Sequence, residues 1–152
     1  MTKLQARQRK ERKAAANRAS DEIFVLIESG DWEQAIERIT VEPNLVFARR
    51  RQWNQTPLLY VCGNSNSYDE QSELTQLILD SGADVNARND EGDTPLHWLA
   101  NWGMSESLYQ LLDAGANLEA KNNMGRTPLF NAVIEGDGDD GHLGHQAMLM
   151  NA

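Results

Sequence analysis

The sequence predicts an all-α solenoid, an array of helix-turn-helix units stacked side by side. Three observations support this prediction. The phrase Thr-Pro-Leu begins at residues 56, 94 and 127, so the last two copies lie 33 residues apart and the first two 38. A glycine stands 12 residues before each of the last two copies, at Gly82 and Gly115. Apolar residues recur between these marks at helical spacing. A period of about 33 residues is typical of arrays whose unit is one helical hairpin plus a turn.

The clearest unit, residues 89–121, shows why each position suits this fold. Gly92 permits the positive φ of a turn. Thr94 can cap the following helix, and Pro95 occupies the first helical position, where its missing N–H is not needed. Gly115 supplies the glycine that ends the second helix. The residues expected to face the core are Leu96, Leu99, Ala100, Leu108, Leu111 and Leu112.

The neighbouring units depart from this pattern in length. The preceding unit has five additional residues, which are predicted to enlarge the polar loop at residues 64–71 between its two helices. In the last unit a Gly-Asp-rich stretch follows the first helix, and a second helix is expected over residues 144–152. The last unit is therefore predicted to be incomplete.

The N-terminal unit is predicted to be divergent, because it has no leading Thr-Pro-Leu phrase. Ser20 begins an apolar helix that Gly30 ends, and Asp31 can cap a second helix. Pro43 prevents that helix from continuing. An extended stretch is expected from there to Thr56.

The phrases Asp-Glu-Gly-Asp-Thr-Pro-Leu-His (residues 90–97) and Leu-Leu-Asp-Ala-Gly-Ala (residues 111–116) closely resemble the ankyrin repeat. The resemblance extends over residues 20–136, with Asn54 in the place of the turn glycine. It implies a curved solenoid of three to four repeats with projecting β-hairpin-like turns. The expected organisation is an arm at residues 1–19 and a repeat domain at 20–152, with approximate units 20–50, 51–88, 89–121 and an incomplete 122–152.

Charge is unevenly distributed along the chain. The whole chain carries −9, whereas residues 1–18 hold seven Lys or Arg residues against one Glu, a net +6. The body therefore repels polyanions and the arm attracts them. The single cysteine fits a reducing compartment, and no apolar run is long enough to span a membrane. We expect a monomeric intracellular protein, cytoplasmic or nuclear.

The resemblance implies a binding surface made of hairpin tips and the exposed side of the first helices. A large apolar residue at Trp102 or Trp53 is not required by the stack, so each is a candidate anchor. The Arg49–Arg51 run is a candidate binding site for an acidic partner. Trp98 is assigned to the core. The predicted partner-binding residues are Trp102, Trp53, Arg88, Asp90, Glu91, Asp93, Asn101, Lys121, Asn123, Met124 and Arg126.

Catalysis finds no support in the sequence. His97 belongs to the repeat phrase and is expected to hydrogen-bond within the repeat, and Cys62 is expected to be a small buried residue. No nucleophile–base pair or phosphate loop is recognisable. The acidic stretch 137–145 lacks the ligand pattern of a calcium loop. We therefore predict no enzyme activity, no cofactor and no metal site.

Two functions remain open at this point. The first is a non-catalytic module that binds another protein through hairpin tips and first helices. The alternative places function in the basic arm, as a nucleic-acid-associated or nuclear protein. The arm residues in question are Arg7, Arg9, Lys10, Arg12 and Lys13.

Overall fold

A computed structural model describes residues 5, 7, 20–64, 68–102 and 105–135, and for 68–70, 101, 102, 105, 134 and 135 it describes the backbone only. A helical segment at 20–29 comes first in the repeat body. The elements that follow are α2 (Trp32–Val41), a 3-10 turn η1 (Pro43–Phe47), α3 (Pro57–Cys62), α4 (Tyr68–Asp80), α5 (Pro95–Trp102), α6 (Ser105–Asp113) and α7 (Pro128–Glu135). No strand occurs among these residues, which confirms the all-α prediction.

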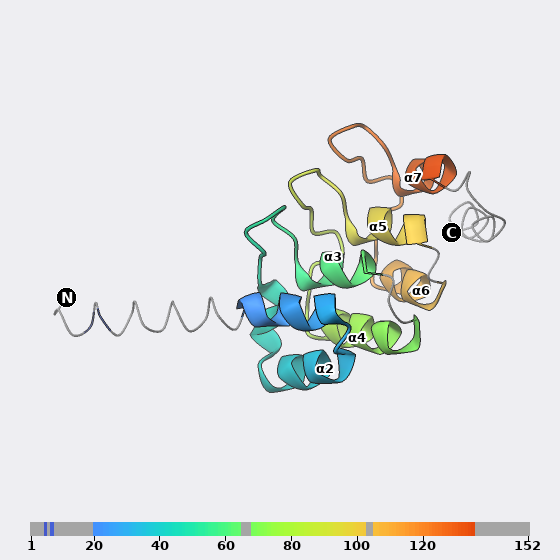
Figure 1. The fold of residues 1–152 in the computed structure, drawn as a ribbon. Helices are drawn as coiled ribbons and strands as arrows, with labels where there is room; N and C mark the ends of the chain where they lie inside the picture. The colour runs from blue at the N-terminus through green and yellow to red at the C-terminus, as the bar shows by residue number, and fades with distance from the viewer. Residues whose placement is uncertain (1–4, 6, 8–19, 65–67, 103–104, 136–152) are drawn as a thin grey trace.

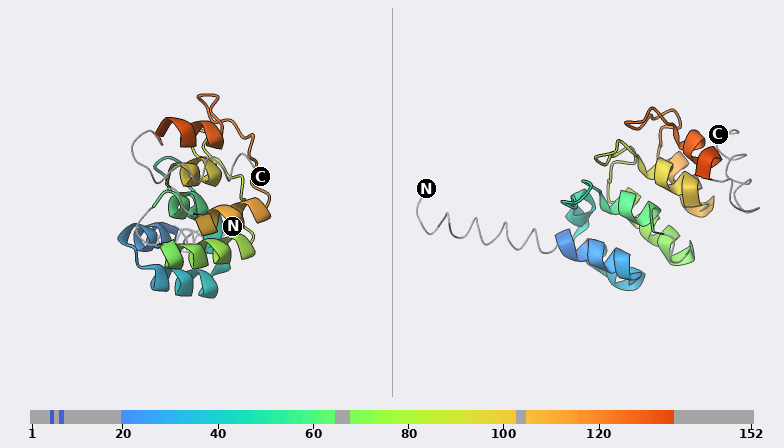
Figure 2. Two further views of the ribbon diagram at one scale, coloured as in Figure 1. Left: turned by 90° about the vertical axis from the view of Figure 1, so that its right-hand side faces the viewer. Right: turned by 45° about the horizontal axis from the view of Figure 1, so that its top comes forward.

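The helices form two layers (Figure 1). The first helices of the units stack in one layer, where α3 contacts α5 and α5 contacts α7. The second helices stack in the other layer, where α2 contacts α4 and α4 contacts α6. The turns between units project together from one edge of the stack, as Figure 1 and the right-hand view of Figure 2 show. This arrangement confirms the predicted solenoid.

The repeated phrase begins three helices as expected. The hydroxyl of Thr56 accepts a hydrogen bond from the Leu59 N–H (3.2 Å), and that of Thr127 accepts one from Phe130 (3.3 Å). Each following proline is the first residue of its helix. These bonds satisfy backbone donors that have no partner inside the helix. The phrase is thus a local signal for a helix start.

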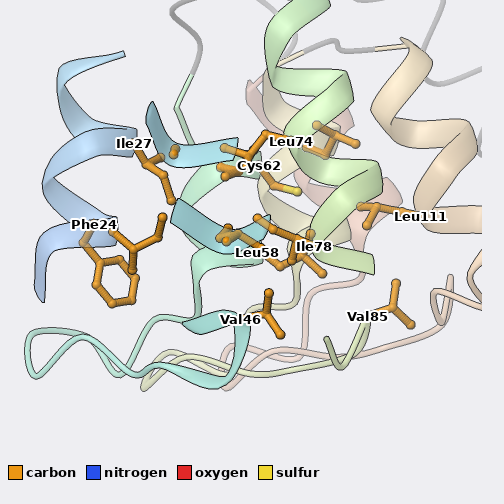
Figure 3. Packing of buried hydrophobic residues seen from close by; sticks show 14 of the residues in the cluster. Phe24, Ile27, Val46, Leu58, Cys62, Leu74, Ile78, Val85 and Leu111 are labelled. Atoms are coloured by element: carbon orange, nitrogen blue, oxygen red, sulfur yellow. The ribbon is translucent and has the colours of Figure 1, made fainter. Parts of the chain in front are cut away.

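The core lies between the two layers. Figure 3 shows Leu58, Cys62, Leu74 and Ile78 directed into the space between α3 and α4, and all four are fully buried. The residues predicted to face inward in unit 89–121 are buried as well, except Leu112, which is half-buried. One continuous apolar cluster therefore runs from the N-terminal unit to α7.

The predicted enlarged loop at 64–71 is wrong in its C-terminal half. The second helix α4 already begins at Tyr68, and it has 13 residues against nine in α6. Most of the additional residues therefore lengthen a helix. Gln71 is buried, and its side-chain amide donates a hydrogen bond to the carbonyl of Val61 near the end of α3. Because the buried Gln71 satisfies a carbonyl near the end of α3, a helical conformation of its own segment is favoured over a loop.

The stretch expected to be extended contains the 3-10 turn η1. Pro43 takes the first position of this turn, and Leu45 and Val46 are buried by it. The tight turn brings two apolar side chains to the core that an extended chain would leave further apart. Burial of this size stabilises the fold by about 1.5–3 kcal/mol per side chain.

The first interunit turn differs from the other two. Asn54 adopts a positive φ of 51° as predicted, but Trp53 does so as well, with φ 66°. In the second turn the side-chain oxygen of Asn89 accepts hydrogen bonds from two turn N–H groups. The first turn has Arg51 at the equivalent position, and an arginine side chain accepts no hydrogen bond. The backbone therefore takes another path there, and Trp53 is held in a strained conformation.

A ladder of hydrogen bonds joins successive turns along the projecting edge. The guanidinium of Arg49 donates to the carbonyl of Arg88 (3.0 Å), and that of Arg88 donates to the carbonyl of Lys121 (2.8 Å). Nearby, Asn86 donates to the carbonyl of Gly115 (3.1 Å) and accepts from the Asn117 N–H (2.8 Å). These bonds fix each turn relative to the next.

Cys62 is predicted to be unreactive in the folded protein. Burial without a stabilising charge raises the pKa of its thiol to about 12, so the thiolate that attacks electrophiles is nearly absent at neutral pH. We expect iodoacetamide to label Cys62 only when the stack opens, at a rate that rises with urea in step with unfolding. Rapid labelling in native buffer, at the rate of a free thiol, would contradict the packing between α3 and α4.

Candidate protein-binding groove

Two hollows lie next to each other on the face formed by the first helices and the turns. The first, of about 470 Å³, is lined by Glu28, Arg50, Gln52, Trp53, Gln55, Leu59, Tyr60, Gly63, Asn64 and Trp98. The second, of about 480 Å³, is lined by Asp90, Glu91, Asp93, His97, Trp98, Asn122, Asn123, Met124, Arg126 and Asn131. None of these residues belongs to α2, α4 or α6. We call the two hollows together the groove.

Trp98 joins the two hollows, because it lines both. It lies four residues after the threonine of the Thr-Pro-Leu phrase, a position that Tyr60 and Asn131 occupy in the neighbouring units. All three side chains line the groove. Assigning Trp98 to the core was therefore only partly right, since it packs against the core but is half-buried. The regular spacing of this position was the signal that could have revealed the groove.

Gly63 makes room for Trp98. A Cβ atom added at Gly63 would lie 2.7 Å from Cε3 of the Trp98 ring, much closer than a normal contact. Its φ of −91° is accessible to every residue, so packing and not backbone conformation requires glycine here. The indole thus lies against the end of α3, and this contact fixes the boundary between the hollows.

The two hollows differ in charge. In the first, Arg50 lies over the ring of Tyr60, 4.8 Å from its centroid, and donates to the carboxylate of Glu28 at 3.3 Å. The second hollow is lined by the carboxylates of Asp90, Glu91 and Asp93 and by a single guanidinium, that of Arg126. The first hollow is therefore charge-balanced, and the second is acidic.

Comparison with known families gives one clear result. A model described as ankyrin repeats (3 copies) matches residues 67–143, which is just over half of the chain. This chain belongs to the ankyrin repeat family. Ankyrin repeats are generally protein–protein interaction modules and typically non-catalytic. No curated protein matched the sequence significantly.

The ankyrin turns bring together seven of the predicted partner-binding residues. Trp53 lines the first hollow and is half exposed. Six others line the second hollow, namely Asp90, Glu91, Asp93, Asn123, Met124 and Arg126. Arg88 and Lys121 lie outside both hollows, in the ladder between turns. Asn101 and Trp102 end α5, but their side chains are outside the described part of the chain.

The Arg49–Arg51 run is used largely within the ankyrin stack. Arg49 donates to two backbone carbonyls, at Asn54 and Arg88. Arg50 is engaged with the side chains that line the first hollow, as described above. Arg51 is exposed, and its side chain has no hydrogen bond or ion pair within the described part of the chain. The run is therefore a weaker candidate binding site for an acidic partner than its sequence suggested, because two of its three charges already have partners.

His97 has the structural role expected for an ankyrin repeat. The Thr94 N–H donates to its Nδ1 (3.2 Å), while Nε2 lies 2.9 Å from the carbonyl of Arg126 in the next turn. A carbonyl only accepts, so Nε2 carries the proton and the ring is neutral. Burial lowers the pKa of His97, which is the main reason the neutral form persists. The ring thus joins two repeats.

The metal, membrane and basic-arm predictions concern other parts of the chain. Among the described residues, no three His, Cys, Asp or Glu side chains are grouped to hold a metal ion. Nor does any described helix have the length and apolar character needed to cross a bilayer. The acidic stretch 137–145 lies outside the described residues. Of the basic arm only residues 5 and 7 are described, so Arg9, Lys10, Arg12 and Lys13 lie outside as well.

Proposed function

We propose that this chain is a non-catalytic module that binds another protein in the groove formed by its first helices and turns. The observation that carries the proposal is the pair of hollows that meet at Trp98. Both are built only from the first-helix layer and the turns, so a single extended segment or loop of a partner can contact them in succession.

Exposed apolar side chains support the proposal. Trp53 is 50% exposed at the rim of the first hollow, and Met124 is 71% exposed at the rim of the second. Neither contributes to the core. Tryptophan and methionine are enriched at protein interfaces, because both bury much apolar area and methionine adapts its shape. The strained backbone of Trp53 is consistent with a residue whose role is binding and not stability.

The test is affinity capture from nuclease-treated extract, with the full chain as bait. The groove variant is Trp53→Asn with Met124→Ser, since asparagine tolerates the positive φ at position 53. The matched control is Tyr109→Ser, because Tyr109 is an aromatic residue with the same 50% exposure on α6, away from the groove. We expect the groove variant to lose the partner that the wild type retains, by tenfold or about 1.4 kcal/mol at least.

Unchanged urea midpoints would show that both variants remain folded. Retention of the partner by the groove variant, or equal loss from the groove variant and the control, would contradict the proposal. If binding instead disappeared only when the arm residues Arg7, Arg9, Lys10, Arg12 and Lys13 were replaced by glutamine, function would lie in the arm.

A further inference from the structure

The second hollow has an excess of hydrogen-bond acceptors. Asp90 and Glu91 are exposed, and Asp93 accepts a hydrogen bond from the Asn122 side chain at 2.8 Å through one carboxylate oxygen. The only cation among the lining residues, Arg126, has its guanidinium over the ring of Phe130, 5.9 Å from the centroid. The charge of the lining is therefore negative on balance.

Asn131 is an independent indication of a ligand. It extends from α7 to line the same hollow and is only 9% exposed. Its Oδ1 has no hydrogen-bond donor within the described part of the chain. A buried acceptor without a donor is costly, and such groups are rare in folded proteins. This oxygen is itself buried, so the amide must turn toward the hollow before a donor that enters the hollow can reach it.

Trp98 adds an aromatic ring to the lining. Its ring is fixed against Gly63 on the side of the first hollow, and it borders the second hollow as well. Its Nε1–H also has no acceptor among the described residues. Tryptophan is the best of the aromatic side chains at attracting a cation to its face.

We propose that the second hollow binds an arginine side chain of the partner protein. Its guanidinium would lie against Trp98, pair with the carboxylates of Asp90 and Glu91, and donate to Oδ1 of Asn131. Arginine fits better than lysine, since its planar fork donates in several fixed directions and stacks on aromatic rings. This inference rests on the proposed function, because it names the partner chemistry that the groove recognises.

The test uses a small probe and needs no partner. N-acetyl-arginine-methylamide is titrated into the full chain and followed by the ¹⁵N NMR signals of the Trp98 indole and the Asn131 amide. The matched probe is the citrulline analogue, which has nearly the same shape without the charge. We expect the arginine probe to shift both signals and to bind about tenfold more tightly than the citrulline probe.

Charge variants locate the binding. Asp90→Asn with Glu91→Gln should weaken the arginine probe about fivefold, because both side chains are exposed and their pairing is partly screened. The control, Glu106→Gln with Asp113→Asn, removes two exposed carboxylates from α6 and should leave the affinity unchanged. Equal binding of the two probes, or equal weakening by the two variants, would overturn the arginine site.

A failure of the arginine site can be distinguished from a failure of the proposed protein-binding function. If the probe does not bind but the Trp53→Asn, Met124→Ser variant still loses its partner, the groove binds a protein of different chemistry. The chain also carries four arginines of its own in residues 1–18. Replacing these with glutamine should not change the affinity of the probe. A large rise in affinity would show that the arm occupies the hollow and would overturn its assignment to a partner's arginine.

Discussion

Gly92→Ala is expected to destabilise the protein by about 3 kcal/mol. Gly92 has φ 79°, and an alanine side chain in this region costs about 1–2 kcal/mol. The added Cβ would also lie 2.9 Å from the backbone nitrogen of Asn123 and 2.6 Å from its Oδ1. That backbone must then move away and lose its 2.9 Å bond to the Glu91 carbonyl. Overpacking of this kind adds about 1–3 kcal/mol.

Gly125→Ala is the matched control. Gly125 occupies the equivalent place in the next turn with φ 74°, but nothing lies within 4 Å of the added Cβ. Its loss should be limited to the conformational cost of about 1–2 kcal/mol. Urea unfolding of the two variants measures the difference. Equal losses would mean that the turns do not contact one another as described.

His97→Leu is expected to cost about 2–3 kcal/mol at pH 8. Leucine fills a similar volume, and the equivalent position in the preceding unit is already Leu59. The substitution leaves the Thr94 N–H and the Arg126 carbonyl without their partner on the ring. Unsatisfied buried backbone groups cost about 1–3 kcal/mol each, partly relieved by relaxation. Urea unfolding measures this loss, and a change below about 0.5 kcal/mol would contradict the bridging role of the ring.

The same variant reveals a pH dependence. The folded-state pKa of His97 lies below its ordinary value of 6.5, so below pH 6.5 the unfolded chain binds a proton that the folded protein resists. The stability of the wild type should therefore fall as the pH drops from 6.5 toward the folded-state pKa. His97→Leu lacks this contribution, so the difference between the two proteins should shrink with acidity. A difference that is constant from pH 8 to pH 5 would contradict the neutral ring.

The stack was predictable because its signals are local. Thr56 and Thr127 cap helices through bonds to residues three positions further on. Gly82 and Gly115 adopt the positive φ that a helix-ending glycine permits. Each of these features depends on a few consecutive residues, so a repeated phrase was enough to place three helix starts and the core residues of the clearest unit.

The groove was harder to predict, because it depends on pairs of residues in different units. The position of the Trp98 ring depends on Gly63, which lies 35 residues earlier and leaves space for it. The role of Arg88 depends in the same way on the Lys121 carbonyl in the next turn. Likewise, Gln71 near the start of α4 donates a hydrogen bond to the carbonyl of Val61 near the end of α3. Sequence periodicity does not specify such contacts.

The most direct test of the groove is hydrogen exchange of the full chain with and without the protein that it captures. The account predicts that binding slows exchange in α3, α5 and the turns at residues 50–55, 89–94 and 122–127, while α2, α4 and α6 are unchanged. Protection confined to the second helices, or to residues 1–18, would contradict binding in the groove.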